Sequence, residues 1–395
     1  MAVTNLNETP NALRLHIAIF GKRNSGKSSL INAITNQATA LVSNVPGTTT
    51  DPVYKAMELL PIGPCVLIDT AGFDDIGELG ELRVKRTQEI VYKTDIALMV
   101  FTAGDNNLSY ESNWIKILTD KKIPVIAVIN KSDVSKEIPF EAKHLLHVLV
   151  SAINGDGISE LKALIIENAP EEFQLSTITG HLVGENDHVL LVAPQDIQAP
   201  KGRLILPQVQ IIRDLLDNKA IITVITTDKL EYTLSLFKAP PKLIITDSQV
   251  FKYVYDHCPK ETALTSFSVL MARYKGDVNE YVKGAKRLDN LTINDKVAIL
   301  EACTHNPLDG DIGRIKIPAI LRKKVGEDLQ IDIYNGSNLP KNIKDYSLAI
   351  HCGGCMFNRR HVLSRIALFK ENNVPITNYG ILIAKVSGIL DKVTI

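Results

Sequence analysis

The sequence lacks a net charge, because its 395 residues include 44 Lys and Arg and 44 Asp and Glu. A chain without an excess of positive charge is not a generally basic nucleic-acid binder, although a local basic patch is compatible with it. The chain also lacks any apolar run near the roughly 18–20 residues that cross a bilayer. Its N-terminal stretch, MAVTNLNETPN, lacks the basic-then-apolar pattern of a secretory signal. We therefore expect neither membrane attachment nor nucleic-acid binding.

Cysteine is scarce, with an odd total of five, and the chain is far longer than a small disulfide scaffold. A reducing cytoplasm fits this usage best, so clustered cysteines indicate metal ligands rather than bridges. Hydrophobic residues make up 45% of the chain, enough for packed cores. At about 150 residues per domain, the length predicts two or three domains.

The pattern of apolar runs predicts an α/β protein of three domains, at residues 1–170, 180–265 and 266–395. In the first region, short apolar runs alternate with amphipathic helical stretches, which is typical of a mostly parallel sheet. The predicted strands are Leu15–Phe20, Val66–Asp69, Ile96–Phe101, Val125–Asn130 and His147–Val150.

The middle region repeats this alternation without a phosphate loop or a convincing catalytic cluster. Its predicted strands are Val189–Val192, Ile221–Thr226 and Leu243–Thr246, and its predicted helices are Leu206–Leu216 and Leu230–Phe237. We expect a small α/β module for docking or dimerisation, although loops at its strand ends could bind a ligand.

The third region holds three of the five cysteines. Cys303, and then Cys352 with Cys355, fall just beyond the carboxyl ends of two predicted strands, where open α/β sheets usually bind ligands. The predicted strands are Val297–Leu300, Leu329–Ile333, Ser347–Ile350 and Tyr379–Ala384.

Residues 21–28, GKRNSGKS, match the phosphate-loop pattern between a predicted strand and a helix pattern at Ser28–Ile34. The glycines let backbone N–H groups surround a phosphate at the positive end of the helix. Lys27 is expected to reach the β- and γ-phosphates, and the Ser28 hydroxyl to bind Mg²⁺. The residues expected to hold the nucleotide here are Gly21, Asn24, Ser25, Gly26, Lys27, Ser28 and Ser29.

Three further short motifs follow in the order that translation-factor-type GTPases require. Asp69 ends a strand and can hold Mg²⁺ through water, and the Gly72 N–H can sense the γ-phosphate. Asp133 can accept both N–H groups of guanine, and adenine would leave that carboxylate unpaired. The remaining residues of this predicted GTP/GDP site are Asn130, Lys131, Ser151 and Ala152.

These motifs resemble the Era/TrmE-like branch of GTPases. The resemblance makes Pro46–Asp51 the first switch, with Thr49 or Thr48 binding Mg²⁺, and Lys27, Thr49 and Gly72 the catalytic residues. Phe73 stands where Ras-like enzymes carry a water-orienting glutamine, so unaided hydrolysis is expected to be slow. Asn24 matches an asparagine that helps hold K⁺ in related enzymes, which implies potassium stimulation. Its alternative role is to stabilise the loop.

Two segments, Cys303-Thr-His305 and His351-Cys-Gly-Gly-Cys355, predict a metal site. The spacing lets Cys352 and Cys355 face one centre, with backbone N–H groups free to donate to the sulfurs. Zinc would close the site with four ligands, whereas a 4Fe–4S cluster would leave one iron open. Spacing does not separate these occupants, and buried cysteines without metal are a third interpretation. Cys65 and Cys258 are expected to be structural.

The combination of a GTPase region, a silent middle region and this cysteine pattern resembles the HydF family of FeFe-hydrogenase maturation GTPases. The resemblance covers the whole chain. It implies a 4Fe–4S cluster on Cys303, Cys352 and Cys355, with His305 and His351 as fourth ligand or as hydrogen-bond partners. It also implies a carrier that receives a diiron precursor made with radical-SAM proteins and delivers it to apo FeFe-hydrogenase. A homodimer through the middle region, or a dimer of dimers, is implied as well.

Two other functions remain open from the sequence. A ribosome- or RNA-associated Era-like GTPase is one, but the zero net charge and the lack of a recognisable RNA module count against it. A zinc-stabilised GTPase switch is the other. The basic residues Arg359-Arg360-His361 are interpreted as a surface patch at a helix start.

Overall fold

The computed structural model describes residues 9–35, 52–70, 87, 89–105, 108–170, 177–194, 204–302 and 312–395. The chain divides into two compact units, Met1–Leu175 and Ser176–Ile395. In the described part of the chain, no helix has the length and apolar character needed to span a bilayer.

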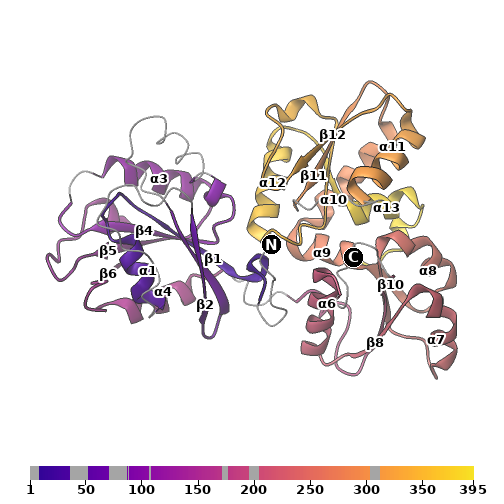
Figure 1. The fold of residues 1–395 in the computed structure, drawn as a ribbon, viewed down its shortest axis with the longest axis horizontal. Helices are drawn as coiled ribbons and strands as arrows, with labels where there is room; N and C mark the ends of the chain where they lie inside the picture. The colour runs from indigo at the N-terminus through magenta and orange to yellow at the C-terminus, as the bar shows by residue number, and fades with distance from the viewer. Residues whose placement is uncertain are drawn as a thin grey trace. The chain divides into compact units, whose positions relative to one another are not determined.

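The N-terminal unit is built on a six-stranded sheet in the order β2-β3-β1-β4-β5-β6 (Figure 1). All neighbouring strands are parallel except β2 and β3. The strands are β1 (Leu15–Phe20), β2 (Val53–Leu59), β3 (Gly63–Asp69), β4 (Ile96–Thr102), β5 (Val125–Asn130) and β6 (Leu146–Leu149), and the longer helices are α1 (Lys27–Thr35), α3 (Ser109–Asp120) and α4 (Ile158–Glu167).

Helices cover both faces of this sheet. Alternate residues of the central strands pack with α1 and α4 on one face, in a cluster that contains Leu30 and Leu161. The other residues pack with α3, in a cluster that contains Trp114 and Leu118. Every residue of β1 is buried. Burial on both faces explains why these strands are nearly continuous apolar runs in the sequence.

All five strands predicted for this unit are confirmed, and β2 is the strand that the prediction missed. Four of the seven residues of β2 are exposed and two are half-buried, and the strand contains Lys55 and Glu58. It lies at the edge of the sheet and pairs antiparallel with β3, so it needs no continuous apolar run.

The C-terminal unit contains two four-stranded, all-parallel sheets, in the orders β10-β9-β7-β8 and β12-β11-β13-β14. The first sheet consists of β7 (His188–Val192), β8 (Ile221–Ile225), β9 (Leu243–Thr246) and β10 (Ala263–Ser266), with α6 (Leu206–Asp217), α7 (Leu230–Leu236) and α8 (Phe251–His257). The second consists of β11 (Lys296–Glu301), β12 (Gln330–Asn335), β13 (Leu348–His351) and β14 (Ile376–Asn378), with α11 (Ile317–Val325), α12 (Arg359–Glu371) and α13 (Tyr379–Val386). Helices α9 (Phe267–Lys275) and α10 (Val278–Ala285) follow β10.

One predicted strand is wrong, because residues Tyr379–Ala384 form most of helix α13. Asn378 begins this helix, and its side chain accepts a hydrogen bond from the Gly380 N–H at 2.8 Å. The helix is buried over most of its surface, so its short sequence is apolar on all sides and cannot be told from a buried strand by periodicity. The true strand, β14, consists of the residues just before it.

A shared core joins the two sheets of this unit. It includes Leu190 and Ile244 from the first sheet, Ala349 and Ile376 from the second, and Val269 of α9 between them in sequence. Helix α9 contacts α6 on one side and α12 and α13 on the other. The C-terminal unit is therefore continuous through α9.

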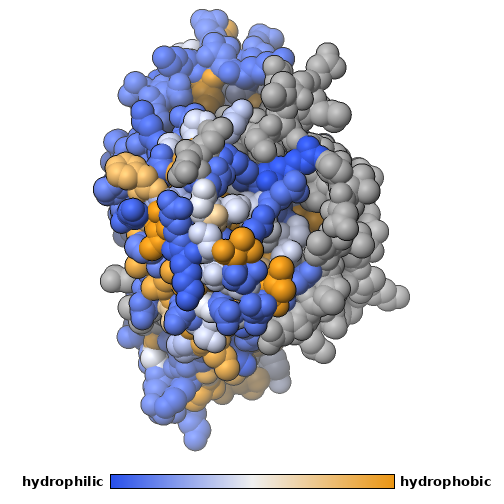
Figure 2. Space-filling model, turned by 90° about the vertical axis from the view of Figure 1, so that its left-hand side faces the viewer, coloured by the Kyte–Doolittle hydropathy of each residue, from blue (hydrophilic) through white to orange (hydrophobic). Residues whose placement is uncertain are grey.

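The surface drawn in Figure 2 is mostly hydrophilic, with hydrophobic residues in small separate groups. Single exposed apolar side chains such as Val134 and Ile153 are normal on protein surfaces and need no functional explanation.

Candidate functional site

The phosphate loop connects the end of β1 to the start of α1. Asn24 has a φ of +60° and Gly26 a φ of +90°, so the loop turns through the left-handed region twice. Asparagine tolerates that region, whereas most residues do not. A Cβ on Gly26 would lie 2.2 Å from the Asn130 Nδ2 atom. Glycine is therefore required at position 26 for both its backbone angle and its lack of a side chain.

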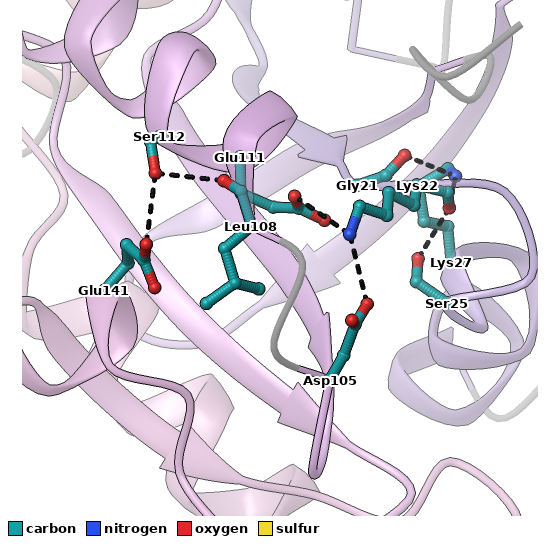
Figure 3. Close-up of polar contacts among 9 residues, drawn as sticks. All are labelled: Gly21, Lys22, Ser25, Lys27, Asp105, Leu108, Glu111, Ser112 and Glu141. Carbon is teal, nitrogen blue, oxygen red and sulfur yellow. Dashed lines mark hydrogen bonds and ion pairs between the residues drawn. The ribbon is translucent and has the colours of Figure 1, made fainter.

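Lys27 and Ser28, the first two residues of α1, contact different neighbours. The buried Lys27 Nζ donates to the carbonyls of Gly21 at 2.8 Å and Lys22 at 2.7 Å, which keeps the ammonium within the loop (Figure 3). The Ser28 hydroxyl donates to Asp69 Oδ2 at 2.8 Å. Burial raises the pKa of Asp69, against the opposing effects of Ser28 and Lys27. The two predicted Mg²⁺ residues thus lie in contact, and Ser29 follows them in α1.

The predicted guanine residues also converge. The buried Asn130 donates through Nδ2 to the Ser25 carbonyl at 2.9 Å and accepts from the Ala152 N–H at 3.2 Å. Asn130 therefore connects the phosphate loop to the segment after β6. The Ser151 hydroxyl donates to Asp133 Oδ1 at 2.7 Å, which fixes the orientation of that carboxylate. Lys131, which lies between Asn130 and Asp133 in the sequence, has a φ of +65°.

An ion-pair cluster beside the phosphate loop was missed by the sequence analysis. The Lys22 ammonium lies 3.1 Å from Asp105 Oδ2 and 3.4 Å from Glu111 Oε2, and Figure 3 shows its side chain extending between the two carboxylates. Burial lowers the pKa of Lys22, but the hydrogen bond to Asp105 and the charges of Glu111 and Asp105 outweigh it and raise the pKa. Burial raises the pKa of Glu111. The cluster connects Lys22 of the phosphate loop to Asp105, which follows β4, and to Glu111 of α3.

Several predicted residues lie outside the described part of the chain. They are Thr48, Thr49, Gly72, Phe73, Cys303 and His305. Their predicted roles in the switches and at the metal remain predictions.

In the C-terminal unit, Cys352 lies directly after β13, at the carboxyl edge of the second parallel sheet. Its sulfur accepts the backbone N–H of Ala302 at 3.1 Å and that of Gly354 at 3.4 Å. Ala302 follows the neighbouring strand β11 and precedes Cys303 in the sequence. Such N–H donors stabilise a thiolate and are a common environment for sulfur ligands of iron.

A buried lysine holds the backbone of the loop between Cys352 and Cys355. Gly354 has a φ of +60°, in the left-handed region that favours glycine. The Lys275 Nζ donates to the carbonyls of Gly354, Cys355 and Phe357. Burial raises the pKa of Cys352 to about 11 and lowers the pKa of Lys275 to about 8, the latter against the thiols of Cys355 and Cys352.

His351 is fully buried and uses both ring nitrogens. Its Nδ1 lies 2.7 Å from the Cys352 carbonyl, and its Nε2 lies 3.4 Å from Arg365 Nη1. The carbonyl requires a proton on Nδ1, so Nε2 is the acceptor from Arg365. Burial and the Arg365 charge lower the pKa of His351 to about 3, so the ring is neutral. The structure therefore places His351 as a partner of the Cys352 backbone and of Arg365.

Two further cysteines, Cys65 and Cys258, lie in different units of the chain. Cys65 is buried in β3 and Cys258 packs against the shared core of the C-terminal unit, and both are free thiols. Burial raises the pKa of each. Within the described ranges, no three Cys, His, Asp or Glu side chains surround a common point, and Cys303 is outside those ranges.

Three family models match successive parts of the chain. A 50S ribosome-binding GTPase model matches residues 16–131, a hydrogen maturase F dimerization domain matches 178–276, and a hydrogen maturase F tetramerization domain matches 279–394. The N-terminal unit is therefore a P-loop GTPase domain. The middle region, expected to dimerise, corresponds to the dimerization model, whose range includes α9.

Similar curated proteins match the GTPase domain. GTPase Der of Wolinella succinogenes is 39% identical over 183 residues, 42% of this chain and 37% of Der. The tRNA modification GTPase MnmE of Endomicrobium trichonymphae is 33% identical over 188 residues, 45% of this chain and 38% of MnmE. The chain thus spans less than half the length of these relatives.

Among solved structures, Era of Aquifex aeolicus matches at 18% identity with a TM-score of 0.36, over 53% of this chain and 92% of Era. The G domain of the T. maritima FeoB iron transporter matches at 26% identity with a TM-score of 0.30, over 39% of this chain and 98% of that domain.

Proposed function

Because the chain belongs to the hydrogen maturase F (HydF) family, we propose that it is a GTP-hydrolysing carrier in the maturation of FeFe-hydrogenase. In this proposal the C-terminal region holds a 4Fe–4S cluster on Cys303, Cys352 and Cys355. The cargo is a diiron precursor, received from radical-SAM maturation proteins in the cytoplasm and delivered to apo FeFe-hydrogenase. Nucleotide state controls binding or release of a partner.

The observation that carries the proposal is the environment of the Cys352 sulfur. It accepts an N–H from Ala302, and Cys303 is the next residue in the chain. The sequences after β11 and β13 therefore meet, although they are 50 residues apart. Two backbone donors on one buried sulfur, with a buried lysine beneath the same loop, fit a thiolate that ligates iron.

Such a cluster, when bound through three cysteines, supplies one iron that can coordinate a guest. We propose that His351 orients the Cys352 peptide rather than ligating this iron, because both of its ring nitrogens already have partners. His305 is then the histidine left for the fourth position, unless the guest itself fills it.

In the GTPase domain, we propose that Ser28 and Asp69 hold Mg²⁺, together with Thr49 of the first switch. Lys27 binds the β- and γ-phosphates, and Asp133 selects guanine. The contact between Ser28 and Asp69, and the orientation of Asp133 by Ser151, support these roles. Phe73 cannot orient the attacking water. In this proposal a K⁺ ion, held in part by Asn24, stimulates hydrolysis instead. Hydrolysis that is faster in K⁺ than in Na⁺, and equal in both for Asn24→Ala, is the expected result.

The dimerization and tetramerization models support assembly into a homo-oligomer. A dimer of dimers would use one region for each interface.

The RNA-associated alternative is less well supported, because the two hydrogen maturase F models together span most of residues 178–394. A zinc switch would give a colourless protein, whereas a cluster gives a brown one.

Transfer to apo-hydrogenase tests the proposal. Anaerobically reconstituted protein is loaded with the diiron precursor and mixed with apo FeFe-hydrogenase, so that each carrier can transfer its cargo once. Hydrogen evolution by the activated hydrogenase is then followed. The wild type should activate the hydrogenase, and Cys352→Ala should not, whereas Cys258→Ala serves as the matched cysteine control. Equal activation by Cys352→Ala and the wild type would rule out the cluster's role.

Nucleotide control is tested by Lys27→Ala in the same assay. This variant should lose GTPase activity and slow the transfer. Transfer at the wild-type rate would show that GTP does not act on this step.

A further inference from the structure

The carboxyl end of α9 meets the loop that carries Cys352 and Cys355. Lys275, the last residue of α9, is 1% exposed. Its ammonium donates to the carbonyl oxygens of Phe357 at 2.7 Å, Gly354 at 3.2 Å and Cys355 at 3.2 Å. An ammonium group has three N–H donors and a neutral amine only two, so this arrangement fits the charged form. One buried charge thus organises the carbonyls of the loop.

Arg359 makes the reciprocal contact. It is the first residue of α12, which follows the loop, and its Nη1 donates to the carbonyls of Tyr274 at 2.7 Å and Gly276 at 3.2 Å. These carbonyls flank Lys275 at the end of α9, where the helix leaves acceptors unpaired and where a cation is favourable. Each segment therefore sends a cation onto the backbone of the other. Arg359 was expected in a surface patch; the helix start is confirmed, but Arg359 is half-buried and His361 is buried.

The start of α9 is connected to the same loop. The Ser268 hydroxyl donates to Asn378 Oδ1 at 3.2 Å, and Asn378 Nδ2 donates to the Cys352 carbonyl at 3.1 Å. Both ends of α9 thus hold the backbone around the cysteines. Since α9 lies in the range of the dimerization model and the cysteines in that of the tetramerization model, the helix connects the two regions.

A thiolate-bound cluster is negatively charged and becomes more negative when it is reduced. A positive charge fixed nearby in a site of low dielectric stabilises both states, and the reduced state more strongly. Arg365 is a second buried cation near Cys352, but its guanidinium contacts His351, the Gly336 carbonyl and the Phe357 ring rather than the loop carbonyls. Lys275, in contrast, donates to the loop carbonyls themselves.

We propose that Lys275 is a positioning residue of the metal site. Together with Arg359, it fixes the Cys352–Cys355 loop. Its buried positive charge helps to retain the cluster and raises the cluster's reduction potential. The inference rests on the proposed function, because it requires a 4Fe–4S cluster on these cysteines. It adds a residue from outside the cysteine motif to the metal site.

The test compares Lys275→Met with the wild type after anaerobic reconstitution. Met keeps the length and apolar stem of the side chain and removes the charge and the donors. Iron and sulfide per protomer, the rate of iron loss to a chelator, and the midpoint potential from an EPR-monitored redox titration are measured. Lys283→Met is the control, because Lys283 lies in α10 with a side chain 76% exposed.

Lys275→Met should lose iron about 10–100-fold faster than the wild type, the usual effect of removing a partner of a metal ligand. Its midpoint potential should be more negative. A loss of packing alone would not change the potential in that direction. Lys275→Arg, which keeps the charge, should return the potential toward the wild-type value, and Lys283→Met should leave both quantities unchanged.

If Lys275→Met does not fold, as judged by circular dichroism and gel filtration, Lys275→Gln carries the same prediction for the potential, because it keeps donors and removes the charge. A loaded Met or Gln variant with the wild-type potential and rate of iron loss would overturn the inference and leave the proposed function standing. A wild-type protein that takes up no iron–sulfur cluster would overturn the proposed function itself.

Discussion

The nucleotide site and the cysteine loop use the same part of an α/β sheet in different ways. Both lie at the carboxyl ends of parallel strands, β1 and β5 in the first case and β11 and β13 in the second. Both offer backbone N–H groups to an anion, a phosphate in one and a sulfur in the other. The phosphate loop is a contiguous motif, whereas the cysteine loop depends on α9, α12 and α13.

The difference shows where each site is vulnerable. In the phosphate loop, the backbone conformation itself is the essential element, because Gly26 has a φ of +90°, which other residues rarely adopt. In the cysteine loop, side chains from distant elements hold the backbone in place. Substitutions that change either the backbone conformation or a supporting side chain therefore test this difference between the phosphate loop and the cysteine loop.

The largest effect is expected for Gly26→Ala. The new Cβ would overlap Asn130 Nδ2 at 2.2 Å in a residue with a φ of +90°. Backbone strain and overpacking together cost about 3 kcal/mol, which corresponds to a roughly 100-fold weaker affinity for GDP. Isothermal titration calorimetry with GDP measures this affinity for the wild type and the variant.

Gly63→Ala is the control for this prediction. Gly63 has a φ of +94° and nothing within 4 Å of its added Cβ, so it has the strain without the overlap. We expect lower stability and unchanged GDP affinity. Equal affinities for the two variants would contradict the role of the Gly26–Asn130 contact.

The second effect compares the two glycines of the cysteine loop. Gly354 has a φ of +60°, and its added Cβ would lie 3.1 Å from Val362 Cγ2, whereas Gly353 has open space. Gly354→Ala should cost about 1–2 kcal/mol in the conformation that binds metal, or roughly 10-fold faster loss of iron to a chelator. Gly353→Ala should behave as the wild type. Similar behaviour of both variants would mean that the loop conformation does not matter for retention.

The smallest effect is expected for Glu111→Gln. This change weakens the ion pair that holds Lys22 against α3, while Asp105 remains as a partner. We expect a loss of about 1 kcal/mol and a roughly fivefold weaker affinity for GDP. Glu160→Gln, at the first turn of α4, is the matched control and should have no effect. A loss as large as that of Gly26→Ala would show that the phosphate loop, too, depends on distant side chains.

The contiguous motifs of both candidate sites could be located from the sequence. Residues 21–28 and the motifs at Asp69 and Asp133 could be placed, because each follows a buried strand that reads as an apolar run. The strands before Cys303 and Cys352 were predicted for the same reason. That they are neighbours in the sheet is what brings Ala302 to the Cys352 sulfur.

The supporting side chains could not be predicted in this way. Lys275 ends α9, a helix with most of its residues buried, and the sequence analysis assigned no role to Lys275, Asp105 or Glu111. Their burial depends on which helix packs against which loop, and periodicity carries no information about that. The strand predicted at Tyr379–Ala384 failed for a related reason, since a short helix that is buried over most of its surface has the composition of a buried strand.

The most direct test of the account is the EPR spectrum of the reduced, anaerobically reconstituted protein, with iron and sulfide analysis. Wild type and the variants Cys303→Ala, Cys352→Ala and Cys355→Ala are compared, with Cys65→Ala as the control. The account predicts a 4Fe–4S signal in the wild type and the control, and its loss in each of the three variants. A full signal in any of these three, or a wild type that contains zinc and no iron, would contradict it.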